Sequence, residues 1–289
     1  MSSEEIDPSP PLADSSAATP PQDVPPGKTP PPPKVWLYPP FLQGLGPDAG
    51  FVKLVIAACI VLYIATLVLH LKGIGLRGTF AFLSPSTESI FFVGATGAIP
   101  VFQFGRWWTV LSSAWLHGSL LHITFNLLWI RDLAPVVAHG YGASRLVIIY
   151  TVAAIVGSAL SSTAGHYLTN VPGLLRGAEL ALGASGAIFG LFGALVAYGQ
   201  MTQNVAIAKK AFKYAVALFA FGFIIPRVDN WAHFGGFLGG YAVTKLPGLD
   251  PRFPETQGHF WVAIACLAAT LASIIASIWH SILVFNLAA

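Results

Sequence analysis

Three short motifs carry side chains that together can perform hydrolysis with a serine nucleophile. Ser185 lies in a Gly-Ala-Ser-Gly motif, His233 lies in a later apolar stretch, and His122 precedes Asn126 by four residues. An imidazole beside a serine hydroxyl can accept its proton while the oxygen attacks a carbonyl carbon. Residues four apart share one helix face, so His122 and Asn126 can both donate hydrogen bonds to the developing negative charge.

Each motif also has a purely structural interpretation. A serine in a helix rich in glycine and alanine commonly packs against a neighbouring helix and bonds to its own backbone. A buried histidine can stay neutral and bond to a carbonyl group, and a histidine–asparagine pair can clasp two helices inside a membrane. His117 lies five residues before His122, which is a poor match to the same helix face, and we expect it to have a structural role.

The positions of the motifs favour the chemical interpretation. Ser185 is expected at the start of a helix, where free backbone N–H groups and the positive end of the helix dipole suit an oxyanion. An ionisable residue within a membrane span, such as His233, is costly and is therefore a candidate for function. Asp229 lies one turn before His233 and is expected to cap that helix, so we expect a serine–histidine dyad without a carboxylate.

The composition indicates that membrane helices hold these motifs. Of the 289 residues, 55% are hydrophobic and only 9% are charged, which is too few charges for the surface of a soluble domain. A helix needs about 20 apolar residues to cross the hydrocarbon core, where it satisfies its own backbone hydrogen bonds. We therefore expect an all-α, polytopic membrane helical bundle. The predicted spans are residues 51–71, 108–130, 146–168, 181–200, 208–225, 229–245 and 258–285.

The alternating direction of consecutive spans brings the three motifs together. The second, fourth and sixth spans all begin on the same side of the bilayer, and these spans carry the motifs. We therefore expect the motifs at similar depth near one membrane face. Small residues let two membrane helices approach closely, and we expect this of the fourth and sixth spans. The glycines concerned are Gly183, Gly186, Gly190, Gly236 and Gly240.

The distribution of positive charge predicts the orientation in the membrane. With the N-terminus inside, ten of the 15 lysines and arginines fall in cytoplasmic segments, and Lys209, Lys210 and Lys213 form the strongest cluster. Seven spans then leave the C-terminus on the opposite face. Residues 1–35 are rich in proline and are expected to form a disordered cytoplasmic tail, without the apolar core of a signal peptide.

Other chemistries lack the residues that they need. The sequence has no His-Glu-x-x-His motif for zinc hydrolysis and no aspartate in the centre of a span. Cys59 and Cys266 both fall in apolar spans and are expected to act as small buried side chains. We therefore expect no metal, no cofactor and no nucleic-acid partner. The long segment 72–107 is rich in aromatic residues and is expected to lie in the membrane interface.

Taken in this order and on these spans, the motifs resemble those of the rhomboid family of intramembrane serine proteases. The resemblance covers residues 51–245, which would form a six-helix catalytic core. It implies that Ser185 is the nucleophile and that His233 is the general base and acid. It also implies that His122, Asn126 and the backbone N–H of the serine form the oxyanion hole.

The resemblance also implies a substrate class. Residues 258–285 would be the additional C-terminal helix of the family's six-plus-one arrangement. The protein would cleave peptide bonds in or near the transmembrane segments of single-span or polytopic membrane proteins, through an acyl-enzyme. The short fifth span, which is aromatic at positions such as Tyr214, would gate the route of the substrate. One departure is Thr109, because family members often carry an arginine there, although Arg106 lies nearby.

Two other functions are compatible with a membrane bundle. A non-catalytic relative that binds membrane segments for quality control would typically lack the serine or the histidine, and this chain has both. A small transporter would show internal repeats and broken helices near the bilayer midplane, and the two halves show no convincing repeat. For a bacterial protein the resemblance implies the plasma or inner membrane, and the oligomeric state is left open.

Overall fold

Helices make up the described part of the chain. The computed structural model describes residues 46–76, 78–172, 175–225 and 227–287, and the proline-rich segment 1–35 lies outside them. Pairing of extended backbone is limited, within these residues, to two isolated β-bridges. The prediction of an all-α bundle is therefore confirmed. The long helices are α2 (Gly46–Leu69), α5 (Leu120–Tyr141), α6 (Ala143–Tyr167), α7 (Ser185–Met201), α8 (Val205–Phe221), α9 (Asn230–Val243) and α10 (Gln257–Leu287).

Several of these helices have the length and composition of membrane spans. Gly50–Leu69 of α2, the whole of α5 and α6, and Gln257–Val284 of α10 are long and apolar enough to cross a membrane. The helix α7 is a shorter apolar helix of 17 residues, which is close to the lower limit for crossing the hydrocarbon core.

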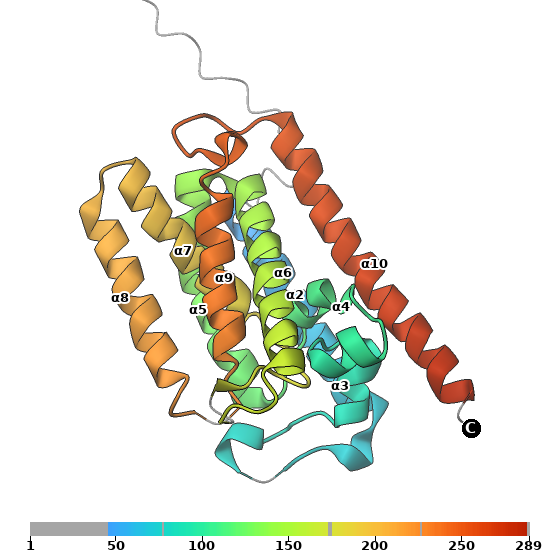
Figure 1. Ribbon diagram of the computed structural model, residues 1–289. Coiled ribbons are helices and arrows are strands. Elements are labelled where there is room, and N and C mark those ends of the chain that lie inside the picture. Colours follow the sequence, from blue (N-terminus) through green and yellow to red (C-terminus); the bar gives the residue numbers. More distant parts are fainter. Residues whose placement is uncertain (1–45, 77, 173–174, 226, 288–289) are drawn as a thin grey trace, which may run out of the picture. The chain divides into compact units, whose positions relative to one another are not determined.

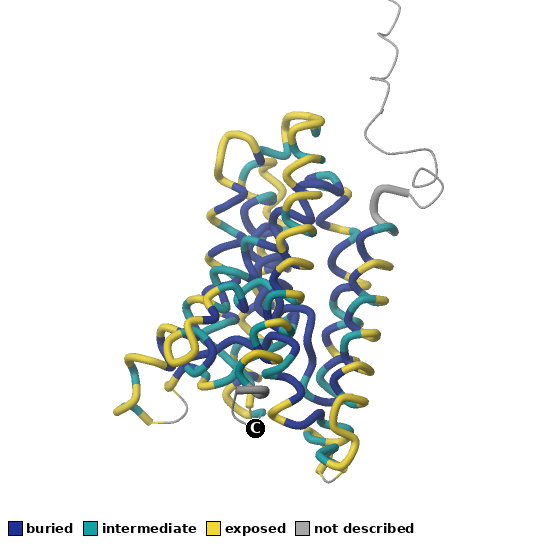
Figure 2. The backbone as a smooth tube through the Cα atoms, turned by 90° about the vertical axis from the view of Figure 1, so that its right-hand side faces the viewer, coloured by how far each residue is buried: buried dark blue, intermediate teal, exposed yellow. Residues whose placement is uncertain are grey.

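The helices α6, α7 and α9 form the centre of the bundle. In the most apolar part of α6, 61% of the residues are buried, against 22% in α10. Figure 1 shows α8 and α10 on opposite sides of this central group. Figure 2 shows buried backbone gathered in the interior, while the outer helices carry exposed positions along their length. Apolar side chains on these outer positions suit contact with lipid.

Glycines set the close approach of α7 and α9. A Cβ atom on Gly236 would collide with the carbonyl group of Gly186, and one on Gly240 would collide with the carbonyl group of Gly190. The two backbones are therefore in direct contact at two successive turns. Without side chains between them, helices in lipid gain van der Waals contact over their whole facing surface. The first residues of the two helices are held at a short distance as a result.

The second long helix begins later and ends later than the sequence predicted. The predicted span 108–130 is wrong, because α5 starts at Leu120, where Ser119 accepts a hydrogen bond from the backbone N–H of His122 at 3.2 Å. The helix then continues past Arg131 and Asp132, which form an exposed ion pair at 2.8 Å. The connection expected between the predicted spans, residues 131–145, is therefore mostly helical, because α5 ends at Tyr141 and α6 begins at Ala143. Charged side chains that reach water do not end a helix.

The segment between α2 and α5 is folded and partly buried. It contains the short helices η1 (Leu71–Gly73), η2 (Thr79–Ala81), α3 (Thr87–Val93), η3 (Ile99–Gln103), α4 (Thr109–Ser112) and η4 (Ser113–Trp115). Its apolar side chains Ile90, Val93, Ala95 and Leu116 form a second buried cluster. Other aromatic residues such as Trp107 remain exposed. The segment therefore packs on the bundle through one side and presents its rings on the other.

Arg106 anchors this segment to the last helix. Its side chain is fully buried, and its guanidinium donates to the carbonyl of Phe91 at 2.9 Å and to that of Ser277 at 3.1 Å. Trp108 adds a hydrogen bond from its indole N–H to the hydroxyl of Ser277 at 3.1 Å. The buried Thr109 donates to the carbonyl of Arg106 at 2.7 Å. An arginine at position 109 is thus not needed to anchor the segment.

Candidate active site

Ser185 and His233 are hydrogen-bonded to each other. Ser185 is the first residue of α7, and His233 is a buried residue in the first turns of α9. The Nε2 atom of His233 lies 2.9 Å from the hydroxyl oxygen of Ser185. A neutral imidazole with its proton on Nδ1 accepts the serine proton at Nε2, which is the arrangement that activates a hydroxyl.

The ring of His233 is held by stacking and not by a carboxylate. The ring of Phe189, one turn after Ser185 on α7, stacks on the imidazole with centroids 4.1 Å apart and planes 10° apart. The Nδ1 atom of His233 is buried and has no hydrogen-bond partner in the described part of the chain. Two side chains on the same helix, Ser185 and Phe189, therefore contact the histidine at its polar atom and at its face.

Asp229 caps the helix that carries His233, as predicted. Its carboxylate accepts a hydrogen bond from the backbone N–H of Ala232 at 3.0 Å, and its carbonyl accepts one from the N–H of His233 at 3.1 Å. Its second carboxylate oxygen accepts a hydrogen bond from the hydroxyl of Ser161 on α6. Since these contacts occupy the carboxylate, it serves the start of the helix and not the imidazole ring.

His122 lies against the turn that precedes the serine. Its Nδ1 atom accepts a hydrogen bond from the backbone N–H of Gly118 at 3.3 Å, which leaves the proton on Nε2 as a donor. A Cβ atom on Gly183 would lie 2.7 Å from this Nε2 atom. The imidazole N–H therefore sits beside the backbone that leads into Ser185.

Gly183 has a different role from the one predicted. It precedes α7 instead of lying within it, so it is not a helix-packing residue. Its φ angle of 129° lies in the region that glycine adopts freely and other residues rarely do. Both the backbone angle and the nearby ring of His122 exclude a side chain at this position. Gly186, Gly190, Gly236 and Gly240 do lie at the α7–α9 contact described above.

Asn126 lies one turn beyond His122 on α5 and is buried. Its amide nitrogen donates to the carbonyl of His122 at 2.8 Å, while its amide oxygen is buried without a partner among the described residues. The amide nitrogen carries two protons, so one N–H remains for another acceptor. His117 is fully buried in the turn before α5, with its ring centroid 5.3 Å from that of His122. It therefore supports His122 by packing.

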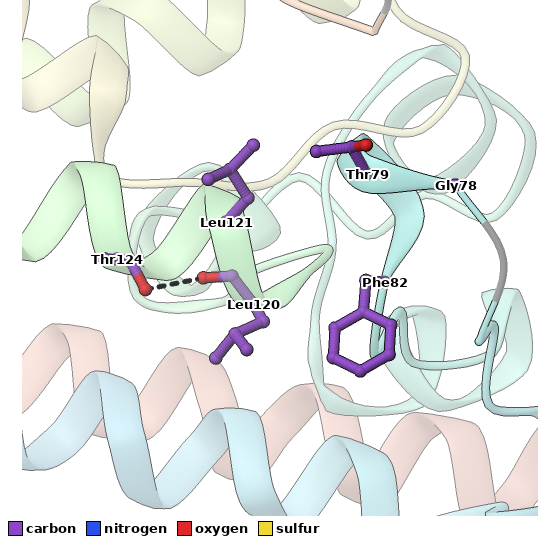
Figure 3. Close-up of a pocket in the computed structure, with 6 residues that line it drawn as sticks. All are labelled: Gly78, Thr79, Phe82, Leu120, Leu121 and Thr124. Carbon is purple, nitrogen blue, oxygen red and sulfur yellow. Dashed lines mark hydrogen bonds between the residues drawn. The ribbon is translucent and has the colours of Figure 1, made fainter.

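A pocket opens beside the start of α5 (Figure 3). It has a volume of about 540 Å³ and is lined by Gly78, Thr79 and Phe82 on one side and by Leu120, Leu121 and Thr124 on the other. The hydroxyl of Thr124 is directed to the carbonyl of Leu120 at 2.8 Å. The walls are therefore largely apolar. These residues carry no motif in the sequence, where the position of Leu121 next to His122 is the available signal.

The chain is similar in sequence to known proteins over the part that holds this site. A family model described as the Rhomboid domain matches residues 104–247. The chain is 31% identical over 169 residues to "Rhomboid protease GluP" of Bacillus subtilis, which covers 57% of this chain and 31% of that protein. It is 32% identical over 176 residues to "RHOMBOID-like protein 5" of Arabidopsis thaliana, covering 59% and 53%.

A further relative is matched over more of its own length. The chain is 30% identical over 146 residues to "Putative rhomboid protease YdcA" of Bacillus subtilis, which covers 49% of this chain and 68% of that protein. The chain spans only about a third of the first relative and about half of the second.

Proposed function

Because the chain belongs to the rhomboid family, we propose that it is an intramembrane serine endopeptidase with Ser185 as its nucleophile and His233 as its general base and acid. The protein is an integral, multi-pass membrane protein, in line with its family and its several spanning helices. The observation that carries the proposal is the 2.9 Å hydrogen bond between His233 Nε2 and Ser185 Oγ.

The reaction begins with attack on a peptide carbonyl. The hydroxyl of Ser185 loses its proton to Nε2 of His233 while its oxygen forms a bond to the carbonyl carbon. The tetrahedral intermediate then collapses, and the imidazolium gives the same proton to the leaving amine. Water attacks the resulting acyl-enzyme with the histidine again acting as base. This step releases the acid product and restores the hydroxyl.

The negative oxygen of the intermediate needs donors that are already in place. We propose that these are the Nε2–H of His122, the free amide N–H of Asn126 and the backbone N–H of Ser185. The contact between His122 and Gly183 supports this assignment. Ala184, the residue that caps α7, has no side-chain acceptor, so the first N–H groups of the helix are not capped by it. Such donors act strongly because they do not have to reorganise during the reaction.

Substrate is proposed to enter between α5 and α8. In α8, burial is restricted to Ala211 and Ala215 within the described residues, so the helix is weakly held. One contact to α5 is between the rings of Trp129 and Tyr214, whose centroids are 6.0 Å apart. The apolar pocket beside Leu121 is suited to a hydrophobic side chain of the substrate. Transmembrane segments of single-span or polytopic membrane proteins are the proposed substrates.

The orientation proposed for the protein places the lysines of α8 on the cytoplasmic side. Lys209, Lys210 and Lys213 are all exposed, near the start of that helix. The dyad lies at the starts of α7 and α9, and the start of α8 follows the end of α7. The site would therefore open toward the opposite, non-cytoplasmic face.

The test is cleavage of a single-span substrate in liposomes by the wild type and by Ser185→Ala and His233→Ala. We expect product from the wild type alone. A fluorophosphonate, which reacts with activated serines, should label the wild type and neither variant. Equal cleavage by all three proteins would point to a contaminating protease and contradict the proposal. Failure of the wild type both to cleave and to be labelled would favour a non-catalytic role in binding membrane segments.

A further inference from the structure

We infer that Asp229 and Ser161 are positioning residues, whose hydrogen bond keeps the helix that carries His233 aligned with the loop that leads into Ser185. The inference rests on the proposed hydrolase function and concerns the same site. The dyad contact joins two helices, α7 and α9, that are preceded by different loops. Their first turns must therefore be held relative to each other by contacts outside the dyad.

The carboxylate of Asp229 contacts both its own helix and α6. One carboxylate oxygen accepts from the backbone N–H of Ala232, and the other accepts from the hydroxyl of Ser161. Because a carboxylate accepts at both oxygens and donates at neither, it can hold the helix cap and the serine at once. An asparagine has one accepting and one donating end, so it cannot make both contacts in the same way.

Ser161 connects this cap to the loop before α7. Its side chain is fully buried, and its hydroxyl oxygen also accepts a hydrogen bond from the backbone N–H of Ala178 at 3.4 Å. Because the hydroxyl donates its proton to Asp229, its oxygen can still accept the hydrogen bond from Ala178 in the loop. One buried hydroxyl on α6 therefore contacts both segments that lead to the dyad.

The loop between Ala178 and Ser185 transmits its position to the serine. Ala181 and Thr96 exchange two backbone hydrogen bonds of 2.9 and 2.7 Å, and the N–H of Gly183 donates to the carbonyl of Ser113 at 2.9 Å. The stretch from Ala178 to Ser185 is therefore held along its length against the segment before α5, so the positions of Ala178 and Ser185 are linked. The indole N–H of Trp231 in α9 also donates to the carbonyl of Leu175 at 2.9 Å, which adds a second contact between α9 and the loop before α7.

The chemical consequence follows from the geometry of proton transfer. A displacement of about 1 Å in a reacting group can reduce a rate by about a hundredfold. Loss of the contact between Asp229 and Ser161 would loosen α9 against the loop without removing any group that reacts. The expected effect is a slower chemical step, with binding of the substrate little changed.

The test compares Asp229→Asn, Ser161→Ala and the double variant with the wild type in liposomes. The matched control is Thr163→Ala, because Thr163 is exposed on the same helix and its hydroxyl bonds to Ala159 of its own helix. Three quantities are measured for each protein: the rate at which a fluorophosphonate labels Ser185, kcat and KM for a single-span substrate, and the thermal midpoint. Hydrogen exchange of residues 178–184 is followed in parallel.

We expect each single variant to lower the labelling rate and kcat about tenfold or more, with KM unchanged and faster exchange in residues 178–184. The double variant should be no slower than the slower single variant, because each single variant already removes the contact between Asp229 and Ser161. Rates equal to the control, or effects that multiply in the double variant, would overturn the inference. If the wild type is not labelled but the variants still exchange faster than the wild type in residues 178–184, the proposed hydrolase function is refuted and the alignment role stands. Unchanged exchange would refute the alignment itself.

Discussion

The guanidinium of Arg106 and the backbone carbonyl of Ser277 form a hydrogen bond of 3.1 Å between the first long loop and the last helix of the protein. The two residues are 171 positions apart in the sequence. A fully buried guanidinium whose two terminal nitrogens donate to the carbonyls of Phe91 and Ser277 holds both segments, because any separation would leave charge without a partner. The helix α10 is therefore tied to the segment between α2 and α5 and is not an appendage.

Arg106→Ala is expected to lower the free energy of unfolding by about 2–4 kcal/mol, because it removes the hydrogen bonds to the carbonyls of Phe91 and Ser277 and leaves the space of a fully buried side chain empty. Arg106→Lys should recover only part of the lost stability, since an ammonium group cannot reach both carbonyls as the planar guanidinium does. Thermal unfolding in a mild detergent measures the difference. Arg176→Ala is the control: its ion pair with Glu179 is largely exposed and should contribute less than about 1 kcal/mol. Equal effects of Arg106→Ala and Arg176→Ala would contradict the anchoring role.

His122→Ala and Asn126→Ala are each expected to lower kcat by about 10²–10³, with a small change in KM. The reason is that the donors are proposed to act on charge that exists only in the transition state. Steady-state cleavage of a single-span substrate in liposomes separates the two constants. Thr202→Ala, which removes an exposed hydroxyl bonded to its own helix, is the control. An increase in KM with an unchanged kcat would instead assign the two residues to substrate binding.

Gly236→Ala is expected to destabilise the protein by about 1–3 kcal/mol, since the added methyl group would collide with the carbonyl of Gly186. The separation of α7 from α9 should also slow the labelling of Ser185 by a fluorophosphonate. Gly248→Ala is the matched control, because the added atom meets nothing within 4 Å. A variant at position 236 that is as stable and as reactive as this control would disprove close packing as the requirement.

A cross-link between α5 and α8 is expected to block cleavage of a transmembrane substrate. The pair Trp129→Cys and Tyr214→Cys can be joined by a short thiol cross-linker, since the two rings are in contact. Cleavable linkers allow activity to be measured again after release. The wild type treated with the same reagent controls for its own thiols, Cys59, which is buried, and Cys266, which is partly buried. Full activity of the linked protein would rule out substrate access between these helices.

Much of the fold could be predicted from the sequence because the signals are local. A long apolar stretch in a chain with few charges has one low-energy solution in lipid, which is a helix. The glycines at Gly186, Gly190, Gly236 and Gly240 indicated which helices approach closely. The positions of Ser185 and His233 near the starts of their spans indicated that they share one side of the bundle, since neighbouring spans alternate in direction.

Helix boundaries and the roles of loop residues could not be predicted in the same way. The second span was predicted to end at residue 130, although the helix α5 continues beyond Arg131 and Asp132 to Tyr141. Gly183 was assigned to helix packing, although it forms the turn that accommodates the ring of His122. In both cases the local pattern is compatible with two structures, and the neighbouring segments select one of them.

The sequence by itself determined the class of protein, the membrane helices and the residue types available for hydrolysis. These follow from hydrophobicity and from short motifs, which act over a few residues. The tertiary structure alone decided that His233 reaches Ser185, that Asp229 meets Ser161, and that Arg106 meets the last helix. Each of these contacts joins residues that are far apart in the chain, and each depends on how whole helices pack to bury apolar surface and exclude unpaired polar groups.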